Sequence, residues 1–479
     1  MKRAVLALLA AIPAGAVPYF VTVKAWPEIV VPAYFMTKGG ILYKTIFFPH
    51  TPLLISTVAG LGHLFGFSAL LFRSIVSAGL LATAALIASG LERRRGFSLA
   101  VTVGVLLSVL WASYMEGLAV WPDALLAPVV LGAALLLERF DASGSAASLR
   151  WGGLLLGFAI LVKQTSAWVA AAALLWMILR RRRLPAIATL GVAICAPYVV
   201  FVLFWGVAYR TGSHLYWTLA MPLFSSHAGE IRETGGWNDV HEAIAPFLIL
   251  PALPLLRGRL EILRSPMFLM ALGTAGMAWP RGGLLHLSSS VGLLAFLGAR
   301  GVLESASRLA SWRSESPAFG RLAGAAVGAA MLLTSVAVAA WSGGGFLLEG
   351  RGGNVFYWDD PFTIQLEKEV SSRVPPGGRL LLFNTRRDNL YALTSTRTPN
   401  GIYVNSSFWY YFNKDAVSAR VMDGLEKFSG WILFREPDSS DNELRKTALY
   451  RFLSSRTVVE EPASDSMTWR RVQAPVREK

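Results

Sequence analysis

Three ionisable residues in largely apolar surroundings are the first candidates for chemistry. Glu28 follows Pro27 early in the chain, Asp123 lies within WPDALLAP, and Lys163 lies within AILVKQTSAW. A carboxylate can take a proton from an attacking hydroxyl group, and a lysine ammonium group can hold a phosphate. These residue types therefore suit the transfer of a group away from a phosphate.

Each of these residues also has a plain structural explanation. Glu28 fits a solvated loop, and Asp123 fits the N-cap of a helix, a position that aspartate fills well. Lys163 fits a side chain that lies along apolar surface and extends its ammonium group to water. The other reading of Lys163 is an ion pair with an anion at membrane depth, because an unpartnered charge is costly there.

Arg281 and His286, in WPRGGLLHL, add a cation and an imidazole at the end of another apolar pair of segments. We count them with Lys163 as candidates for holding a phosphate, although His286 also suits a packed helix position. The polar segment Lys24–Pro52 is the candidate lid over the acceptor, since a closing loop keeps water from a reactive centre. Its candidate contact residues are Tyr43, Lys44 and His50.

The composition is that of a membrane protein. Of 479 residues, 54% are hydrophobic and 16% are charged, with a mean hydropathy of +0.48, whereas soluble domains carry about 25% charged residues. The net charge of +15 comes largely from short arginine clusters between apolar runs, a pattern that sets membrane orientation. A soluble nucleic-acid-binding protein is excluded. Cys195 is the only cysteine, so no intrachain disulfide or cysteine metal site forms.

Eleven apolar runs are candidate transmembrane helices, several of them shorter than the usual ~20 residues. Short spans indicate re-entrant segments or helices shielded by their neighbours. The first run also resembles a signal peptide, but we interpret it as a retained helix. The runs are Ala4–Val23, Leu70–Leu91, Phe97–Tyr114, Ala124–Leu137, Trp151–Val162, Thr165–Leu179, Pro185–Ala208, Ala243–Leu256, Pro266–Ala278, Leu284–Leu297 and Leu322–Trp341.

The basic residues predict the orientation of these spans. With the N-terminus inside, the inner loops hold 18 Lys and Arg residues and the outer side holds 8. Positively charged loops remain cytoplasmic. We therefore expect an integral protein of a bacterial-type plasma membrane, with a cytoplasmic N-terminus and an extracytoplasmic C-terminus. The apolar segment Leu53–Phe65 is expected to lie along the membrane interface.

The composition changes near Gly343, and 16 of the 30 acidic residues lie beyond Gly352. Arg379–Asn384 and Trp431–Phe434 read as buried strands, and Phe362–Val374 reads as a helix that ends at two prolines. The sequence thus predicts an α-helical polytopic domain over residues 1–342, with a first outer loop at 24–69. A small α/β extracytoplasmic domain is predicted over residues 343–479.

The order of these pieces resembles the membrane glycosyltransferases of the GT-C fold, in the group of protein O-mannosyltransferases and the lipid A aminoarabinose transferase. One span is followed by a long outer loop with an acidic residue, and an outer C-terminal α/β domain closes the order. The matching segments between them are GGILYKTIF, HTPLL, LFGFSALLFR, WPDALLAP, GLLLGFAILVKQ, PRGGLLHL and DNLYALTSTRTP. The resemblance covers most of the chain and is strongest over residues 1–180.

The resemblance implies a polyprenyl-phosphate sugar donor and a lipid, glycan or protein acceptor outside the cytoplasm. It maps the acidic residue of the first outer loop to Glu28, a second acidic residue to Asp123, and the donor-phosphate lysine to Lys163. The family usually has Asp in this loop, where this chain has Pro27-Glu28. A divalent metal near the loop is also implied for some members, with His50 as the candidate ligand.

Two other classes of protein stay open. A transporter or flippase of a lipid-linked substrate often has inverted repeats and charges at mid-membrane, and the sequence shows neither. A catalytically inactive membrane scaffold is compatible with the change to Glu28. For the glycosyltransferase, we expect Glu28 and Asp123 in one outward cavity, with Lys163 and Arg281 on its lipid side. Inverting and retaining transfer both remain open, and the resemblance implies inversion.

Overall fold

The computed structural model describes residues 2–91, 97–209, 214, 215, 218, 240–257, 260–277, 284–312, 319–404, 421–425, 428–437, 442–464 and 466–472. The chain divides into two compact units. The first unit comprises Met1–Val23, Phe72–Trp205 and Ala228–Gly353, and the second comprises Lys24–Leu71, Gly206–His227 and Asn354–Lys479. The segment predicted as the first outer loop thus belongs to the same unit as the C-terminal residues.

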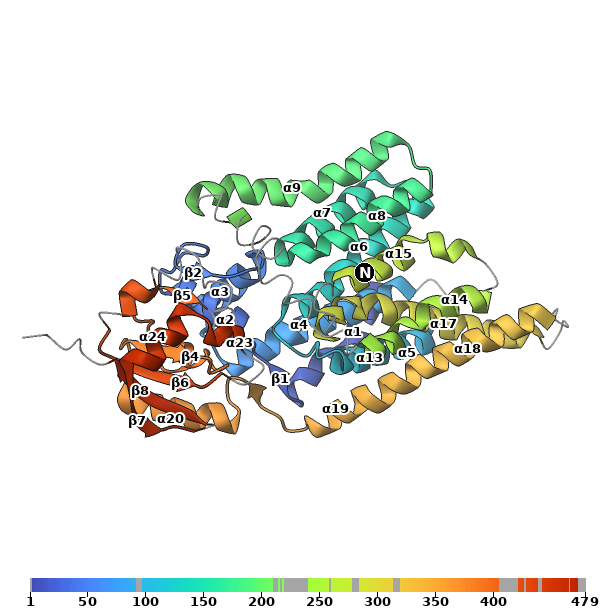
Figure 1. Ribbon diagram of the computed structural model, residues 1–479. Coiled ribbons are helices and arrows are strands. Elements are labelled where there is room, and N and C mark those ends of the chain that lie inside the picture. The colour runs from blue at the N-terminus through green and yellow to red at the C-terminus, as the bar shows by residue number, and fades with distance from the viewer. Residues whose placement is uncertain are drawn as a thin grey trace, which may run out of the picture. The chain divides into compact units, whose positions relative to one another are not determined.

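The first unit is helical, and each of the apolar runs predicted to span the membrane overlaps one or two helices. The first predicted run, Ala4–Val23, extends beyond its helix, which ends at Ala16, to Val23 in a short strand. The helices of this unit, coloured in chain order in Figure 1, are α1 (Lys2–Ala16), α4 (Ala69–Leu91), α5 (Phe97–Tyr114), α6 (Pro122–Ser143), α7 (Ala146–Val162), α8 (Ala167–Leu179), α9 (Leu184–Tyr209), α13 (Val240–Phe247), α14 (Ile249–Arg257), α15 (Pro266–Met277), α16 (Leu284–Leu287), α17 (Val291–Trp312), α18 (Phe319–Val338) and α19 (Gly344–Glu349). Short 3-10 or π turns lie between some of them: η1 (Val17–Tyr19), η2 (Gln164–Ser166), η5 (Leu260–Arg264), η6 (Ser288–Ser290) and η7 (Ala339–Gly343).

Four helical stretches in the described part of the chain are long and apolar enough to cross a membrane alone. They are Ala69–Leu91, Leu184–Phe204, Leu284–Leu303 and Leu322–Glu349. The remaining apolar helices are shorter, and α15 packs closely against α8 within the bundle. The chain is therefore a mostly helical protein with membrane-type helices, and the number of eleven spans stays a prediction.

Glycines allow several of these helices to approach one another closely. A side chain at Gly157 of α7 would lie 2.4 Å from the Ile194 carbonyl oxygen and 2.7 Å from Pro197 of α9. A side chain at Gly343 would lie 2.3 Å from the Leu110 carbonyl oxygen of α5. Small residues at helix contacts are the usual means of packing in membranes, where hydrophobic burial supplies little drive.

The second unit joins N-terminal and C-terminal segments. It holds α2 (Pro27–Thr37), β2 (Ile46–Phe47), α3 (Leu53–Phe65), β3 (Val355–Phe356), α20 (Pro361–Arg373), β4 (Leu380–Phe383), α21 (Leu390–Leu393), β5 (Tyr403–Val404), β6 (Trp431–Arg435), α23 (Asn442–Arg445), α24 (Ala448–Arg456), β7 (Thr457–Pro462) and β8 (Met467–Val472). The two-residue strand β1 (Val23–Lys24) lies at the boundary of the units.

A four-stranded mixed sheet organises the C-terminal residues, in the order β4-β6-β8-β7. Strands β4 and β6 are parallel, with Phe383 opposite Phe434, and the other neighbours are antiparallel. Those two rings stack at 5.1 Å, and the fully buried Trp469 in β8 packs against Trp431 at 5.9 Å. The two predicted strands and the predicted helix are confirmed as β4, β6 and α20. Asp360 caps α20 by accepting the Thr363 N–H, and Pro361 fills its first position.

Candidate active site

Asp123 lies in the first turn of α6 and is fully buried. The predicted N-cap role is wrong, because Trp121 occupies that position in extended conformation and Pro122 is the first helical residue. Proline suits this position, since its fixed φ fits a helix and its missing N–H is not needed there. Asp123 is thus one residue inside the helix, where the positive end of the helix dipole favours a carboxylate.

Lys163 lies at the break between α7 and η2 and is buried, with a side chain 4% exposed. Its extended backbone ends α7, and its side chain reaches the same aspartate. The Lys163 Nζ donates to Asp123 Oδ2 at 2.5 Å. Lys163 therefore pairs with an anion, as one of the two sequence readings expected, and does not extend its ammonium group to water.

His286 completes a cluster of three side chains from three separate segments. It lies on the one-turn helix α16, with a side chain 15% exposed. Its Nδ1 lies 3.1 Å from Lys163 Nζ and 3.3 Å from Asp123 Oδ2. The indole Nε1 of Trp121 also donates to Asp123 Oδ2, at 3.0 Å.

The donors of this cluster converge on one oxygen of Asp123. Oδ2 receives Lys163 and Trp121 and lies within reach of His286, whereas the buried Oδ1 has no hydrogen-bond partner among the described residues. A lysine has three N–H donors. Asp123 takes one of those on Lys163, and His286 takes a second in the tautomer whose Nδ1 carries no proton. Among the described residues at least one donor is thus left for an anion such as a phosphate, held in a fixed direction by the aspartate.

A narrow crevice near this cluster lies between α4, α5, α6 and the start of α17. Most of its lining is apolar, including Val76, Leu80 and Val291. Its wall also contains Ala124, the neighbour of Asp123 in α6, and Ser288, which follows His286 by two residues. The crevice has room for about one water molecule, so it is a packing gap and not a ligand pocket.

Glu28 belongs to the second unit and lies in the first turn of α2, not in an irregular loop. Its side chain is half-buried. Trp26 is the N-cap residue and Pro27 the first helical residue, the same arrangement that precedes Asp123. Because Glu28 and Asp123 lie in different units, their expected convergence in one cavity stays a prediction.

The candidate lid residues occupy a structured turn of the second unit. The buried Tyr43 has φ 63° and donates its hydroxyl to the His50 carbonyl oxygen at 2.7 Å. Lys44 is exposed, and His50 packs its ring edge-on against Phe48 at 5.1 Å. Within the described segments no three His, Cys, Asp or Glu side chains gather as metal ligands do, and a metal at His50 stays a prediction.

Sequence reasoning missed Trp121 as a member of the cluster, and one predicted site residue, Arg281, lies outside the described residues. Trp121 directly precedes Pro122-Asp123, and its potential as an indole donor is visible in the sequence, but only the fold turns the ring back onto the carboxylate. Arg281 falls in residues 278–283, outside the described residues.

The fold defines the class of protein: the chain has the fold of the GT-C membrane glycosyltransferases, as the resemblance implied. It is similar to ArnT from Cupriavidus metallidurans bound to undecaprenyl phosphate, with a TM-score of 0.55 and 13% identity over 97% of this chain and 96% of that chain. For the apo state of the same enzyme the TM-score is 0.54, with 13% identity over 98% of each chain.

A third similar structure is the Archaeoglobus fulgidus oligosaccharyltransferase tethered with an acceptor peptide, with a TM-score of 0.48. It shares 11% identity with this chain over 90% of this chain and 69% of that chain. No protein-family model matches the sequence, and no curated protein matches it. Fold does not fix activity, so the function depends on the chemistry of the site.

Proposed function

We propose that this protein is a membrane glycosyltransferase that moves a sugar from a polyprenyl-phosphate donor to an acceptor on the extracytoplasmic face. The observation that carries the proposal is the buried cluster of Asp123, Lys163 and His286. Buried charges in an apolar bundle are costly and are usually retained for function. The remaining Lys163 donor is of the kind that holds a phosphate.

Two further observations support a lipid-linked donor. The helices around the cluster are apolar and of membrane type, and the ammonium group of Lys163 suits the phosphate of a lipid. The similar ArnT structure is bound to undecaprenyl phosphate. A polyprenyl phosphate combines a phosphate with a hydrocarbon chain in one molecule.

In the proposed reaction, the acceptor hydroxyl oxygen forms a bond to the anomeric carbon of the sugar. The bond from that carbon to the phosphate oxygen breaks, and the polyprenyl phosphate leaves with the electron pair. We assign the acceptor proton to the carboxylate of Glu28. Lys163 stabilises the negative charge that grows on the leaving phosphate, because a preorganised charge acts where charge develops. Asp123 then positions Lys163 instead of serving as the base.

One observation favours a non-catalytic scaffold as the second candidate. Asp123 already neutralises Lys163 at 2.5 Å, and a self-satisfied pair can serve only to fix the helices. Removal of Glu28 separates the two functions, because a scaffold does not need a proton acceptor there.

The test is transfer of labelled sugar from synthetic polyprenyl-phosphate donors, with the protein in nanodiscs. We expect Glu28→Gln to lower turnover by about 10²–10⁴-fold, the usual contribution of a positioned base, with donor binding unchanged. Glu460→Gln changes an exposed glutamate of the same unit and should remain fully active. Full activity of Glu28→Gln would remove Glu28 as the base, and no transfer by the wild type with any donor would favour the scaffold.

A further inference from the structure

The backbone that enters α2 is fixed on both sides of Ala25. The Ala25 N–H donates to the Phe356 carbonyl oxygen at 3.1 Å. The Ala25 carbonyl oxygen accepts from the side-chain amide of Asn389 at 2.8 Å, and the same amide donates to the Tyr357 carbonyl oxygen at 2.8 Å. Asn389 is fully buried. Both N–H donors of its amide are therefore used to join residue 25 to residue 357.

This anchor lies immediately before Glu28. Trp26 is the N-cap residue of α2, and the N–H groups of Ile29 and Val30 donate to its carbonyl oxygen at 3.0 and 3.1 Å. The Trp26 ring packs on Tyr357 at 5.2 Å. Pro27 has a fixed φ, so few free dihedral angles separate Ala25 from Glu28. The position of Ala25 thus sets where the first turn of α2 begins.

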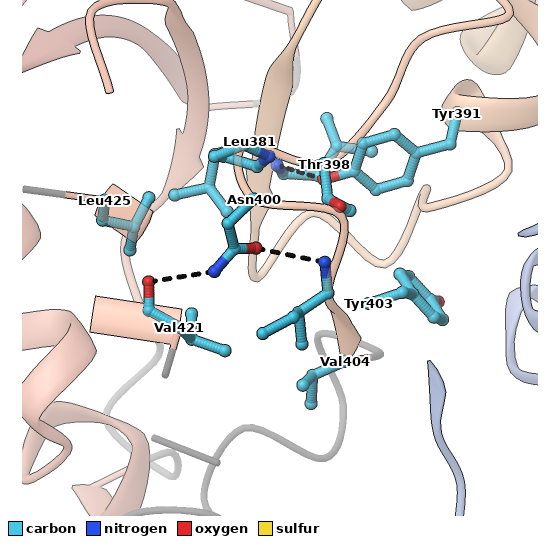
Figure 2. Close-up of a pocket in the computed structure, with 11 residues that line it drawn as sticks. Leu381, Tyr391, Thr398, Asn400, Tyr403, Val404, Val421 and Leu425 are labelled. Atoms are coloured by element: carbon cyan, nitrogen blue, oxygen red, sulfur yellow. Dashed lines mark hydrogen bonds between the residues drawn. The ribbon is translucent and has the colours of Figure 1, made fainter. Parts of the chain in front are cut away.

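Asn389 is itself held on the sheet by its neighbour Tyr391. The Tyr391 hydroxyl donates to the Leu380 carbonyl oxygen and accepts from the Leu382 N–H, both at 3.1 Å. Figure 2 shows this ring directed at strand β4, beside the hollow that Asn400 borders. Burial raises the pKa of the Tyr391 phenol, so the hydroxyl keeps its proton and stays a donor. The segment with Asn389 is therefore attached rigidly to β4.

The partner backbone at Tyr357 is braced by Arg387. The Arg387 guanidinium lies 4.9 Å from the Phe356 ring centre and 4.8 Å from that of Tyr357, and it pairs with Asp360 at 3.2 Å. Asp360 also accepts the Tyr357 N–H at 2.8 Å. Contacts among residues 356–360 and 387–389 thus fix the backbone around Ala25.

The C-terminal part of α2 packs on Tyr391, two residues after Asn389, and on Tyr403. The Phe35 ring packs at 5.3 Å from Tyr391 and 5.1 Å from Tyr403. Strand β2 continues the attachment, with Ile46 paired to Tyr403 in parallel. Helix α2 is therefore held at its start by Asn389 and near its end by the two tyrosines.

We propose that Asn389 is a positioning residue for Glu28: its amide fixes the Ala25 carbonyl group and so the place of the Glu28 carboxylate. This inference rests on the proposed role of Glu28 as the base. On this proposal, the segment Asp388–Pro399 positions α2 in addition to packing on the sheet. Asn389 acts through α2 and touches no reacting atom.

Three variants separate positioning from general stability. Asn389→Ala removes both donors. Asn389→Gln keeps both donors on a stem that is one methylene longer. Thr447→Ala removes a buried cap that accepts the Tyr450 N–H at 3.1 Å. It serves as a control because Thr447 is not among residues 356–360 and 387–389, which fix the backbone around Ala25.

The first readout is amide hydrogen exchange of the full-length protein in nanodiscs, which needs no activity. We expect exchange over residues 24–31 to rise in Asn389→Ala and less in Asn389→Gln, with no rise there in Thr447→Ala. Unchanged exchange over these residues in Asn389→Ala, in protein that remains folded, would overturn the proposal.

The second readout is turnover. We expect Asn389→Ala to lower kcat by on the order of 10-fold to 100-fold with little change in the donor KM, since a shift of about 1 Å costs this much. In the Glu28→Gln background the same change should have no further effect, because the base is already absent. An equal loss in both backgrounds would show that Asn389 does not act through Glu28. Full activity of Glu28→Gln alone would overturn the proposed base, while the exchange data would still decide the anchoring of α2.

Discussion

At the residue scale, the Asp123–Lys163 pair has an energetic consequence that can be measured. Both side chains are buried, and removal of one partner of a buried pair typically costs about 3–5 kcal/mol, because the other charge is left without compensation. We expect Asp123→Leu and Lys163→Met each to lower the free energy of unfolding by about this amount. The double variant should regain most of the loss, because no unpaired charge remains. The measurement is reversible unfolding in detergent.

Activity of the same variants distinguishes a structural pair from a functional one. The double variant should be stable and inactive if Lys163 holds the donor phosphate, and stable and active if the pair only fixes the helices. Glu138→Gln breaks the less buried contact of Glu138 with Arg300 at 2.9 Å and should cost no more than about 1 kcal/mol. A double variant as unstable as its single variants would contradict the assigned coupling.

The sequence predicts the residue types of this cluster but not its contacts. Asp123, Lys163 and His286 were all candidates because each interrupts an apolar segment. Their meeting depends on the packing of three segments up to 163 positions apart, which no local pattern encodes. The N-cap prediction for Asp123 was wrong for a local reason: Pro122 is so well suited to the first helical position that the cap moves to Trp121. The corresponding sequence Trp26-Pro27-Glu28 likewise predicts the start of α2 at Pro27.

At the element scale, two neighbouring glycines allow a matched test of helix packing. A side chain at Gly343, the last residue of η7, would meet the Leu110 carbonyl oxygen of α5 at 2.3 Å, whereas none lies within 4 Å at Gly344. Gly343→Ala should therefore destabilise the protein by about 1–3 kcal/mol, the usual cost of overpacking. Gly344→Ala should stabilise it by about 0.5–1 kcal/mol, since alanine loses less backbone entropy in a helix. Thermal unfolding in detergent measures both.

Equal effects of the two substitutions would show that α5 does not approach η7 closely.

The existence of these helices is predictable from the apolar runs, because each run is long enough for two or more turns. Their irregular features are not. Hydropathy does not report the π turn at Ala339–Gly343, nor the end of α13 at Phe247, which lies four residues before Pro251, whose ring crowds the Phe247 carbonyl group in a helix.

At the scale of the whole molecule, the short helices constrain how the chain can lie in a bilayer. Helix α8 has 13 residues and α15 has 12, or about 20 Å each at ~1.5 Å per residue. The hydrocarbon core is about 30 Å thick. Such helices are tolerated where other helices shield their ends, and α15 packs against α8. The number of crossings is therefore not given by hydropathy alone, and topology has to be measured.

The orientation of the chain can be tested with reporters fused at two positions. The arginine cluster at residues 180–183 follows α8, and positively charged loops stay in the cytoplasm. A fusion after residue 183 should therefore read cytoplasmic. Past this point, Leu322–Glu349 is a predominantly apolar helical stretch of 28 residues, about 42 Å at ~1.5 Å per residue. It is long enough to cross alone and leads directly to residue 352. With eleven crossings, a fusion after residue 352 should read extracytoplasmic, on the side where the proposed acceptor lies. A cytoplasmic signal there would make the number of crossings even and would separate the C-terminal residues, with Asn389, from the face on which transfer is proposed.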